Sequence, residues 1–435
     1  MSRATLVVVA VLVIIYWSEK AQPAAQNRAG TGGRTRGGRI CFGEFWSVLW
    51  SAPRRGRFSR SIMLGTTAAG RRYLPSSDSL LVFGPTRSGK TLTLALPLLN
   101  EFAGPAVVTS VKRDLYQRSI SARQGRGECT LFDLSDPTSS SWNLFSLVAD
   151  LASAKEISDS LCGVTRETTS EIEFWSRLAS KMLAPLLLAA TELGASLGEM
   201  IGWIERQDLE VAFDGLTQAE HLEARSALEA VVHLDQRAVS SVVATLLSLL
   251  EPYSDPVVSD LLSREGIDLV RLFAKGRSDT LYICSPLFRA ERFFGVYEVF
   301  LRKVFDTAYQ SDNGDRKVLF LLDEIANIAP ISDLAKIAST CGGYGLVLVS
   351  IFQDLTQLSA LYGGHAGTVV NNHRSKLLLS GISDQATLDY VERAYSRRVK
   401  DRDSVNPLLD LKMGKGLLMQ ANSRPVRLRL RPFPR

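Results

Sequence analysis

The eight residues GPTRSGKT, from Gly84 to Thr91, constrain the fold of this chain more than any other stretch. They match the pattern G-x-x-x-x-G-K-[ST], in which the backbone N–H groups of a glycine-rich loop surround phosphate oxygens. The preceding LLVF is typical of a buried strand, and LTLALPLLNEF after the loop has helical character. Strand, glycine loop and helix in this order predict a phosphate site at a helix N-terminus. The alternative is an ordinary βα turn with a chance lysine.

The pattern assigns a role to each part of the loop. We predict that the backbone and side chains of Gly84, Pro85, Thr86, Arg87, Ser88, Gly89, Lys90 and Thr91 bind a nucleotide. Lys90 is expected to neutralise charge on the β- and γ-phosphates, and the Thr91 hydroxyl to ligate Mg²⁺. The predicted cofactors are therefore ATP and Mg²⁺.

A second element that such a site needs is a strand that ends in acid, and VLFLLDEIAN (318–327) supplies it. Four apolar residues precede Asp323, so we expect it at the carboxyl edge of the sheet, where open α/β folds bind ligands. Asp323 is predicted to complete the Mg²⁺ shell, and Glu324 to orient and deprotonate the attacking water. Alone, such an acidic pair is often a helix N-cap.

Six further runs have the same buried-strand pattern: 105–110, 130–134, 280–285, 346–352, 376–381 and 416–420. Helical stretches alternate with them, which predicts an α/β fold with a parallel sheet covered on both faces. The run LVLVSIF (346–352) is followed by Gln353, again at a carboxyl edge, where a polar side chain could sense the γ-phosphate. A polar cap on a turn is the competing interpretation of Gln353.

Residues 150–271 contain no strand-like run, and their apolar positions recur at spacings of three and four, which predicts helices. We therefore expect an all-α domain at 150–271, inserted into a nucleotide-binding domain made of residues 73–149 and 272–435. The five cysteines are scattered without a C-x-x-C pair, which argues against a zinc site or a disulfide framework and fits a reducing compartment.

The first residues of the chain predict a membrane anchor. Ala4 to Trp17 is uncharged, and with snorkelling ends the stretch from Arg3 to Lys20 spans roughly 26 Å as a helix, which suits a thinned bilayer. We assign residues 1–20 to a single-pass anchor in the inner or plasma membrane. A cleaved signal peptide and a buried core helix are the alternatives.

Charge sets the predicted orientation of this anchor. Residues 1–72 hold twelve basic and two acidic side chains, a net +10 in a chain of net +6, so the rest carries −4. Arginines that follow the apolar stretch place the body in the cytoplasm, where an ATP site would function. Residues 21–72 are interpreted as a basic Gly/Arg-rich linker that does not fold.

The layout resembles one family, the coupling proteins of conjugative type IV secretion of the TraG/TraD kind. The resemblance covers about residues 78–432. The stretches that carry it are GPTRSGKTLTLALPLL, VVTSVKRDLY, WNLF at 142–145, EFWSRLA at 173–179, LFLLDEIANIAPI, SIFQDLTQL and KLLLSGISD. The family's members are RecA-like, hexameric, membrane-anchored ATPases that pass single-stranded DNA bound to its relaxase into a secretion channel.

The resemblance therefore implies specific partners and roles for this chain: relaxase-bound single-stranded DNA, channel components, the membrane and a homo-hexamer. It also implies that Lys90 and Thr91 bind nucleotide and Mg²⁺, Asp323 completes the metal shell, Glu324 is the catalytic base and Gln353 is the sensor. Conjugative transfer of DNA, or of a protein substrate, would be the function.

The chain departs from the family's pattern at three points. The family often has an arginine in an R-G-Y-G-like stretch that reaches a neighbour's nucleotide, and this chain has CGGYG with Gly342 in that place. Arg374 and Lys415 are candidate replacements. Ser110 and Arg113 stand where the family tends to have Asp and Gly. The family usually has two membrane spans, and we predict one at most.

Two alternative functions remain open from the sequence. A related double-stranded DNA translocase or helicase is one; a translocase of the septal kind should carry a C-terminal winged helix, which we do not recognise here. A docking protein that binds ATP and hydrolyses it poorly is the other, and CGGYG is the argument for it.

Overall fold

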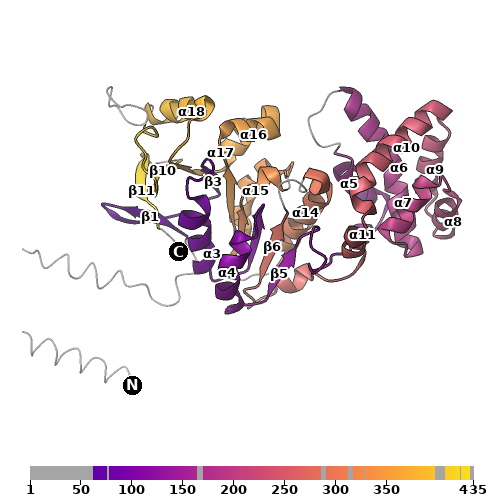
Figure 1. Cartoon of the computed structure of the whole chain (residues 1–435), viewed down its shortest axis with the longest axis horizontal. Helices are drawn as coiled ribbons and strands as arrows, with labels where there is room; N and C mark the ends of the chain where they lie inside the picture. The colour runs from indigo at the N-terminus through magenta and orange to yellow at the C-terminus, as the bar shows by residue number, and fades with distance from the viewer. Residues whose placement is uncertain are drawn as a thin grey trace, which may run out of the picture. The chain divides into compact units, whose positions relative to one another are not determined.

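The computed structural model describes residues 62–75, 78–163, 170–285, 291–311, 317–328, 330–396, 407–421 and 423–431. Within them, the strands form one 11-stranded sheet in the order β2-β1-β11-β10-β9-β3-β8-β7-β4-β6-β5 (Figure 1). The strands are β1 Met63–Thr67, β2 Gly70–Tyr73, β3 Leu80–Phe83, β4 Ala106–Ser110, β5 Cys129–Phe132, β6 Thr280–Cys284, β7 Val318–Leu322, β8 Leu346–Phe352, β9 Ser375–Leu379, β10 Lys415–Gln420 and β11 Val426–Arg429.

Seven neighbouring strands, from β9 to β5, are parallel, and their residues are buried alternately against two layers of helices. Leu80 and Val82 pack into a core with the helix after the phosphate loop, whereas Leu81 and Phe83 face the opposite core. Burial on both faces explains why these strands are continuous apolar runs in the sequence. The helices of this domain are α3 Leu96–Glu101, α4 Asp114–Gln124, α14 Phe294–Gln310, α15 Leu334–Thr340, α16 Leu355–Tyr362, α17 Ala366–Asn372 and α18 Gln385–Ser396.

The predicted α/β fold is confirmed, but the sheet is mixed where we expected it to be parallel. All six further strand runs form strands, and β10 pairs with β9 in the antiparallel sense. The turn before β10 lies at the same edge as the end of β9, since Gly416 is paired with Leu379. A connection that starts and ends at one edge returns the chain in the opposite direction.

The structure also corrects the linker prediction for its last residues. Residues 21–61 lie outside the described part of the chain, but β1 and β2 form a hairpin at 63–73 that joins the sheet through β11. Leu64 and Leu74 are buried in the core that also contains Leu428. The segment folds because these few apolar residues have a partner strand, β11, from the far end of the chain.

In the described residues between β5 and β6, the regular elements are all helices (Figure 1). They are α5 Leu151–Leu161, α6 Ser170–Leu193, α7 Leu197–Glu205, α8 Glu210–Gln218, α9 Leu222–Val232, α10 Gln236–Leu250, α11 Pro256–Ser263 and α12 Leu269–Leu272. The long apolar helix α6 is the centre of this group. Helix α5 meets α14 closely, because a Cβ at Gly295 would lie 2.8 Å from the Leu161 Cα.

No helix among the described residues is long and apolar enough to cross a bilayer. The predicted anchor at residues 1–20 lies outside the described residues and stays a prediction.

Candidate nucleotide-binding site

The sheet order brings three predicted segments together at one edge. The phosphate-loop strand β3 lies beside β8, and β8 lies beside β7, all three parallel. Their carboxyl ends are followed by Gly84, Gln353 and Asp323 in turn. The Gly84 N–H donates to the Phe352 carbonyl at 3.1 Å, so the loop starts directly beside the residue before Gln353. This edge is where parallel α/β sheets bind ligands.

The phosphate loop owes its shape to its glycines. A Cβ at Gly84 would lie 2.7 Å from the Ser88 Oγ and 2.9 Å from the Leu379 Cδ1, so no other residue fits without displacement. Gly89 has φ 90° and precedes the helical turn Lys90–Ala95, which continues into α3. Arg87 has φ 66°, an uncommon conformation for a residue with a side chain. The loop therefore directs its backbone N–H groups and a helix N-terminus toward one spot.

Lys90 is buried, with 7% of its surface exposed, and its Nζ donates to the Gly84 carbonyl at 2.8 Å and to that of Pro85 at 3.3 Å. These contacts hold the ammonium inside the loop rather than in solvent. Phosphate oxygens could replace the two carbonyls as acceptors if only the end of the Lys90 side chain moved. The Ser88 Oγ is also buried and has no hydrogen-bond partner among the described residues.

Asp323 follows β7 and is 5% exposed, and its Oδ1 has no hydrogen-bond partner in the described part of the chain. Burial raises the pKa of Asp323 to about 7; the Glu324 carboxylate acts in the same direction and Lys90 opposes it. A buried carboxylate oxygen without a partner costs free energy unless it is protonated or binds a cation. The donor set thus fits Mg²⁺, which prefers carboxylate and hydroxyl oxygens.

Glu324 adopts the left-handed conformation, with φ 51° and ψ 41°. This costs a residue with a Cβ about 1–2 kcal/mol, and such strain is concentrated at functional sites. Glu324 precedes the one-turn helix Ile325–Asn327, and its side chain does not cap it. The N-cap alternative for the acidic pair therefore has no support in the geometry.

Gln353 is half-buried at the end of β8, between the phosphate loop and Asp323. The cap of the following helix α16 is Asp354, whose carboxylate accepts from the Gln357 N–H at 2.8 Å, while the Gln357 Oε1 accepts from the Gln353 N–H at 2.9 Å. Capping is thus performed by Asp354 and Gln357, the neighbours of Gln353.

The positions proposed for the missing arginine lie at different edges. Arg374 precedes β9, whose Ser375 pairs with Leu80, and Gly342 lies in the turn Cys341–Tyr344 before β8. Both are at the amino edge, away from the phosphate loop of their own chain. Lys415 begins β10 next to the pair Gly416–Leu379 and is therefore at the loop's edge, exposed to solvent.

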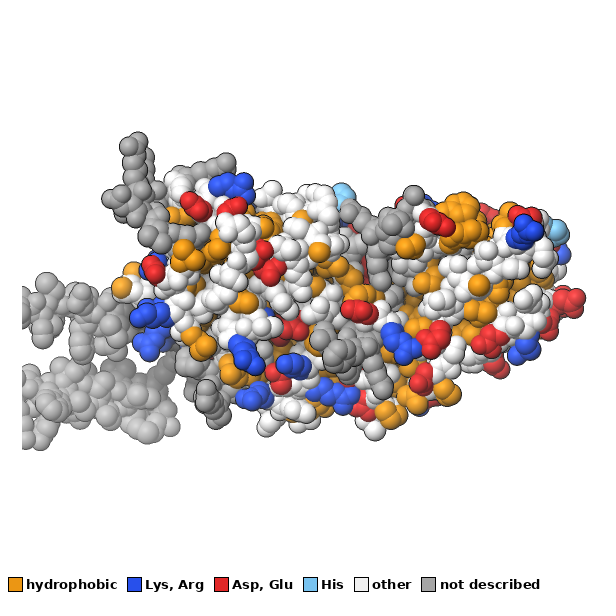
Figure 2. Space-filling view, turned by 45° about the horizontal axis from the view of Figure 1, so that its top comes forward, with side chains coloured by type: hydrophobic (Ala, Val, Ile, Leu, Met, Phe, Trp, Pro, Cys, Tyr) orange, Lys and Arg blue, Asp and Glu red, His pale blue; other side chains and the backbone are white. Residues whose placement is uncertain are grey.

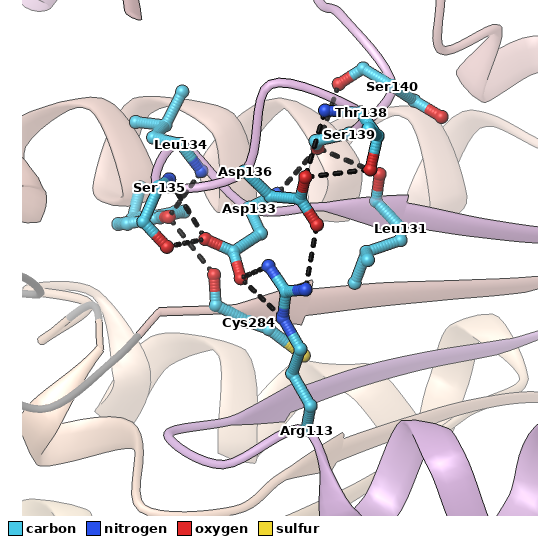
Figure 3. Close-up of polar contacts among 11 residues, drawn as sticks. Arg113, Leu131, Asp133, Leu134, Ser135, Asp136, Thr138, Ser139, Ser140 and Cys284 are labelled. Atoms are coloured by element: carbon cyan, nitrogen blue, oxygen red, sulfur yellow. Dashed lines mark hydrogen bonds and ion pairs between the residues drawn. The ribbon is translucent and has the colours of Figure 1, made fainter.

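The sequence did not predict the ionic cluster at the carboxyl ends of β4 and β5 (Figure 3). Arg113 forms ion pairs with Asp133 at 2.6 Å and with Asp136 at 2.7 Å, and Asp133 is fully buried. The Asp133 Oδ1 also accepts from the Ser135 N–H at 2.9 Å. The cluster ties the loop after β4 to the loop after β5. The available signal was the acid that directly follows the TLF strand.

Ser110, the other departure in this stretch, ends β4, and its Oγ donates to the Lys112 carbonyl at 2.6 Å. Its hydroxyl therefore stabilises the turn that leads to Arg113.

Comparison with known proteins assigns the chain to a group. A family model described as type IV secretory system conjugative DNA transfer matches residues 54–399. A conjugal transfer protein TraG of Escherichia coli is 22% identical over 319 residues, which is 66% of this chain and 50% of that protein. Protein VirD4 of Agrobacterium fabrum is 20% identical over 330 residues, 72% of this chain and 49% of that protein. The chain thus spans about half the length of these curated relatives.

Solved structures share the fold. The plasmid coupling protein TrwB in complex with the non-hydrolysable ATP analogue ADPNP superposes with a TM-score of 0.67 at 18% identity, covering 87% of this chain and 91% of that one. VirB4 of Thermoanaerobacter pseudethanolicus superposes with a TM-score of 0.51 at 12% identity, covering 86% of this chain and 96% of that one. The likeness to TrwB confirms the predicted RecA-like α/β fold.

Proposed function

Because this chain belongs to the type IV secretory system conjugative DNA transfer family, we propose that it is a coupling ATPase that delivers relaxase-bound single-stranded DNA to a secretion channel. The observation that supports the enzymatic part is that the phosphate loop, Gln353 and Asp323 follow the carboxyl ends of three neighbouring parallel strands, β3, β8 and β7. The Asp323 Oδ1, which has no hydrogen-bond partner among the described residues, and the phosphate loop together fit Mg²⁺ and a nucleoside triphosphate. TrwB, a structural neighbour, has been solved with ADPNP and with ADP and Mg²⁺, which supports ATP and Mg²⁺ here.

The residues of this edge divide the reaction among them. Residues Gly84 to Thr91 hold the phosphates, Lys90 neutralises their charge, and Thr91 and Asp323 hold Mg²⁺. The ion, when bound, supplies positive charge for the transferred phosphoryl group. Glu324 orients the attacking water and accepts its proton, and Gln353 contacts the γ-phosphate. The left-handed conformation of Glu324 is a strained backbone geometry of the kind that is concentrated at functional sites, which supports this role.

Assembly and location complete the proposal. We propose a homo-hexamer, in which the amino edge of one chain faces the nucleotide of the next, because Gly342 and Arg374 lie at the edge away from their own loop. Residues 1–20 are proposed to anchor the chain in the inner membrane, with the ATPase body in the cytoplasm. Channel components are the expected partners at that membrane.

A docking protein that binds ATP but turns it over slowly is the second candidate. The observation that favours it is Gly342 in CGGYG, since an arginine acting from a neighbour contributes ~10³–10⁵ in rate. A double-stranded DNA translocase of the same ATPase class is the third, and it gains no support from the described residues.

Nucleotide binding by the wild type and Lys90→Ala, followed by calorimetry with ADPNP and Mg²⁺, tests the site. We expect Lys90→Ala to bind at least about tenfold more weakly, because it removes the ammonium beside the phosphates. Asp323→Ala should lose the Mg²⁺-dependent part of the affinity. The matched control is Lys112→Ala, an exposed lysine at the carboxyl edge of β4, which should bind like the wild type. Equal affinity in Lys90→Ala and Lys112→Ala would remove the loop from the site.

A further inference from the structure

The antiparallel end of the sheet carries a row of basic side chains. In the register of its four strands, Lys415 pairs with Arg429, Arg429 with Thr66, and Thr66 with Arg71. Directly opposite residues of antiparallel strands point to the same face of a sheet. Lys415, Arg429 and Arg71 therefore share one face, and Arg427, two residues from Arg429, lies on that face as well.

Charge on this end is unbalanced. Further exposed basic residues lie in the adjoining turns and strands, namely Lys412, Arg424 and, on the opposite face of β2 from Arg71, Arg72. In the part of the chain that the structure describes, neither these three residues nor the four residues of the row make an ion pair. Many arginines elsewhere are paired with acids, among them Arg113, Arg177, Arg225, Arg264, Arg271, Arg277, Arg292 and Arg302. Asp410 is an exposed acid nearby, and Glu101 is engaged by Arg431.

Apolar side chains protrude beside these charges. Met413 is 76% exposed, Leu409 62% and Tyr73 40%. Met413 lies in the turn KMGK, which the Lys415 N–H closes by donating to the Lys412 carbonyl at 3.0 Å, and Gly414 has φ 78°. The turn thus presents a methionine between two lysines. Figure 2 shows Lys and Arg side chains together with hydrophobic ones at its left end, over these strands.

We propose that this basic-apolar surface, made of Arg71, Lys412, Met413, Lys415 and Arg429 with Leu409 beside it, docks on the anionic headgroups of a membrane. Basic side chains near an anionic leaflet each contribute roughly fivefold in affinity. Met413 and Leu409 can enter the boundary between headgroups and acyl chains, as the apolar residues of interfacial anchors do. A nucleic acid backbone would use the same charges but would leave both apolar side chains in water.

The chain's own sequence favours a membrane as the occupant. Strand β1 begins at Met63, and the uncharged stretch Ala4–Trp17 precedes it, with nine basic and two acidic residues between Ser18 and Ile62. A membrane-bound start would tether the β1–β2 hairpin to a bilayer through the residues that precede Met63. The inference adds to the proposed anchor a second contact made by the folded body, and it does not require ATP hydrolysis.

The test places an environment-sensitive fluorophore at Met413→Cys in the full-length chain, with Cys41 and Cys129 replaced by serine. Vesicles of phosphatidylcholine, with or without phosphatidylglycerol, carry nitroxide quenchers at headgroup depth. We expect quenching at least about fivefold stronger with phosphatidylglycerol. A probe at Val270→Cys, 74% exposed in the all-α group, should be unaffected. Sedimentation with phosphatidylcholine alone tests the N-terminal anchor separately.

Charge-reversal variants test the residues themselves. Lys412→Glu with Arg429→Glu should abolish the phosphatidylglycerol-dependent quenching at position 413 and leave ATP binding unchanged. Arg206→Glu with Arg237→Glu, the same change of net charge on the all-α helices, should retain it. Absence of quenching with phosphatidylglycerol, or equal loss in both pairs, would overturn the proposal. So would protection of the probe by single-stranded DNA or by self-association without lipid, since either would assign the surface to another partner.

Discussion

At the scale of single residues, Arg123 is the largest side chain that the described part of the fold buries completely. Its guanidinium donates to the carbonyls of Phe102 at 2.5 Å, Gly104 at 2.8 Å and Ser278 at 3.1 Å, and its Nε donates to the Thr280 Oγ1 at 2.7 Å. The carbonyls of Phe102 and Gly104 follow α3, the helix of the phosphate loop, and that of Ser278 precedes β6. One cation therefore joins the end of that helix to a strand from across the helical insertion.

Arg123→Met should lower the free energy of unfolding by roughly 3–5 kcal/mol, because it leaves several buried carbonyls without a donor. Urea denaturation at neutral pH measures this. Arg126→Met is the matched control: Arg126 donates to the carbonyls of Phe102 and Asn100 but is exposed, so water can replace it and the loss should stay below about 1 kcal/mol. Equal losses in the two variants would refute the role of burial.

His373 makes stability depend on pH. It is fully buried, with Nδ1 on the Val369 carbonyl at 2.8 Å and Nε2 on the Ser350 Oγ at 3.0 Å, and burial lowers its pKa to about 4. The unfolded chain therefore binds this proton first, at pH near 6.5, and stability falls as the pH drops from 6.5 toward 4. The wild type should lose about 1.4 kcal/mol through His373 between pH 7.5 and pH 5.5.

Urea unfolding of His373→Gln at the two pH values isolates this contribution. The free energy of unfolding of the variant minus that of the wild type should be about 1.4 kcal/mol higher at pH 5.5 than at pH 7.5, because glutamine does not titrate. If this difference in the free energy of unfolding is the same at both pH values, the pKa of His373 is not depressed and the prediction fails.

The sequence predicted some of these residues and not others. Lys90, Asp323 and Gln353 follow strands whose apolar runs are unmistakable, so their edge could be inferred before the sheet order was known. The partners of Arg113 and Arg123 could not, because Asp133, Ser278 and the carbonyls after α3 come near them only through the pairing of β4, β5 and β6. Main-chain acceptors leave no trace in a sequence.

At the scale of elements, the strands that were missed are short and lie at the antiparallel end. Strand β2 is fully exposed and contains two arginines, and β11 buries one residue of four. Such strands are stabilised by their neighbours, and their residues lack the apolar run that marks a central strand. The direction of β10 was likewise set by its connection and not by its composition.

The two edges of the parallel strands also decide what an arginine at position 342 can do. Strand β8 has seven residues, so Gly342 lies roughly 20 Å or more from the phosphate loop of its own chain. We expect Gly342→Arg to raise ATP turnover at least about tenfold, and only at concentrations where chains assemble, because the guanidinium would reach a neighbour's γ-phosphate.

Steady-state ATPase assays over a range of protein concentrations, with single-stranded DNA present, measure this effect. Arg374, at the same edge with its Nε 3.9 Å from the Asp78 Oδ1, is the internal control. If Arg374 already supplies the charge, Arg374→Ala will lose turnover and retain ATP binding. If Gly342→Arg has no effect and Arg374→Ala stays fully active, the docking-protein alternative gains ground.

At the scale of the whole molecule, function depends on segments that the chain separates widely. The phosphate loop, Asp323 and Gln353 lie at one edge because β8 lies between β3 and β7, while the helices from α5 to α12 occupy the interval between β5 and β6. The alternation of strand and helix patterns was the basis for predicting an all-α domain inserted into a domain with a parallel sheet. It could not predict the strand order, which follows from packing and from right-handed crossovers.

The most direct test of the ATPase assignment compares ATP turnover by the wild type and Glu324→Gln, with and without single-stranded DNA, at increasing protein concentration. The wild type should hydrolyse ATP faster per chain as concentration rises and DNA is added. Glu324→Gln should bind ADPNP like the wild type and lose about 10²–10⁴ in turnover, because glutamine retains the shape but cannot accept a proton. Hydrolysis by Glu324→Gln at the wild-type rate would contradict the assignment of this edge as the catalytic site.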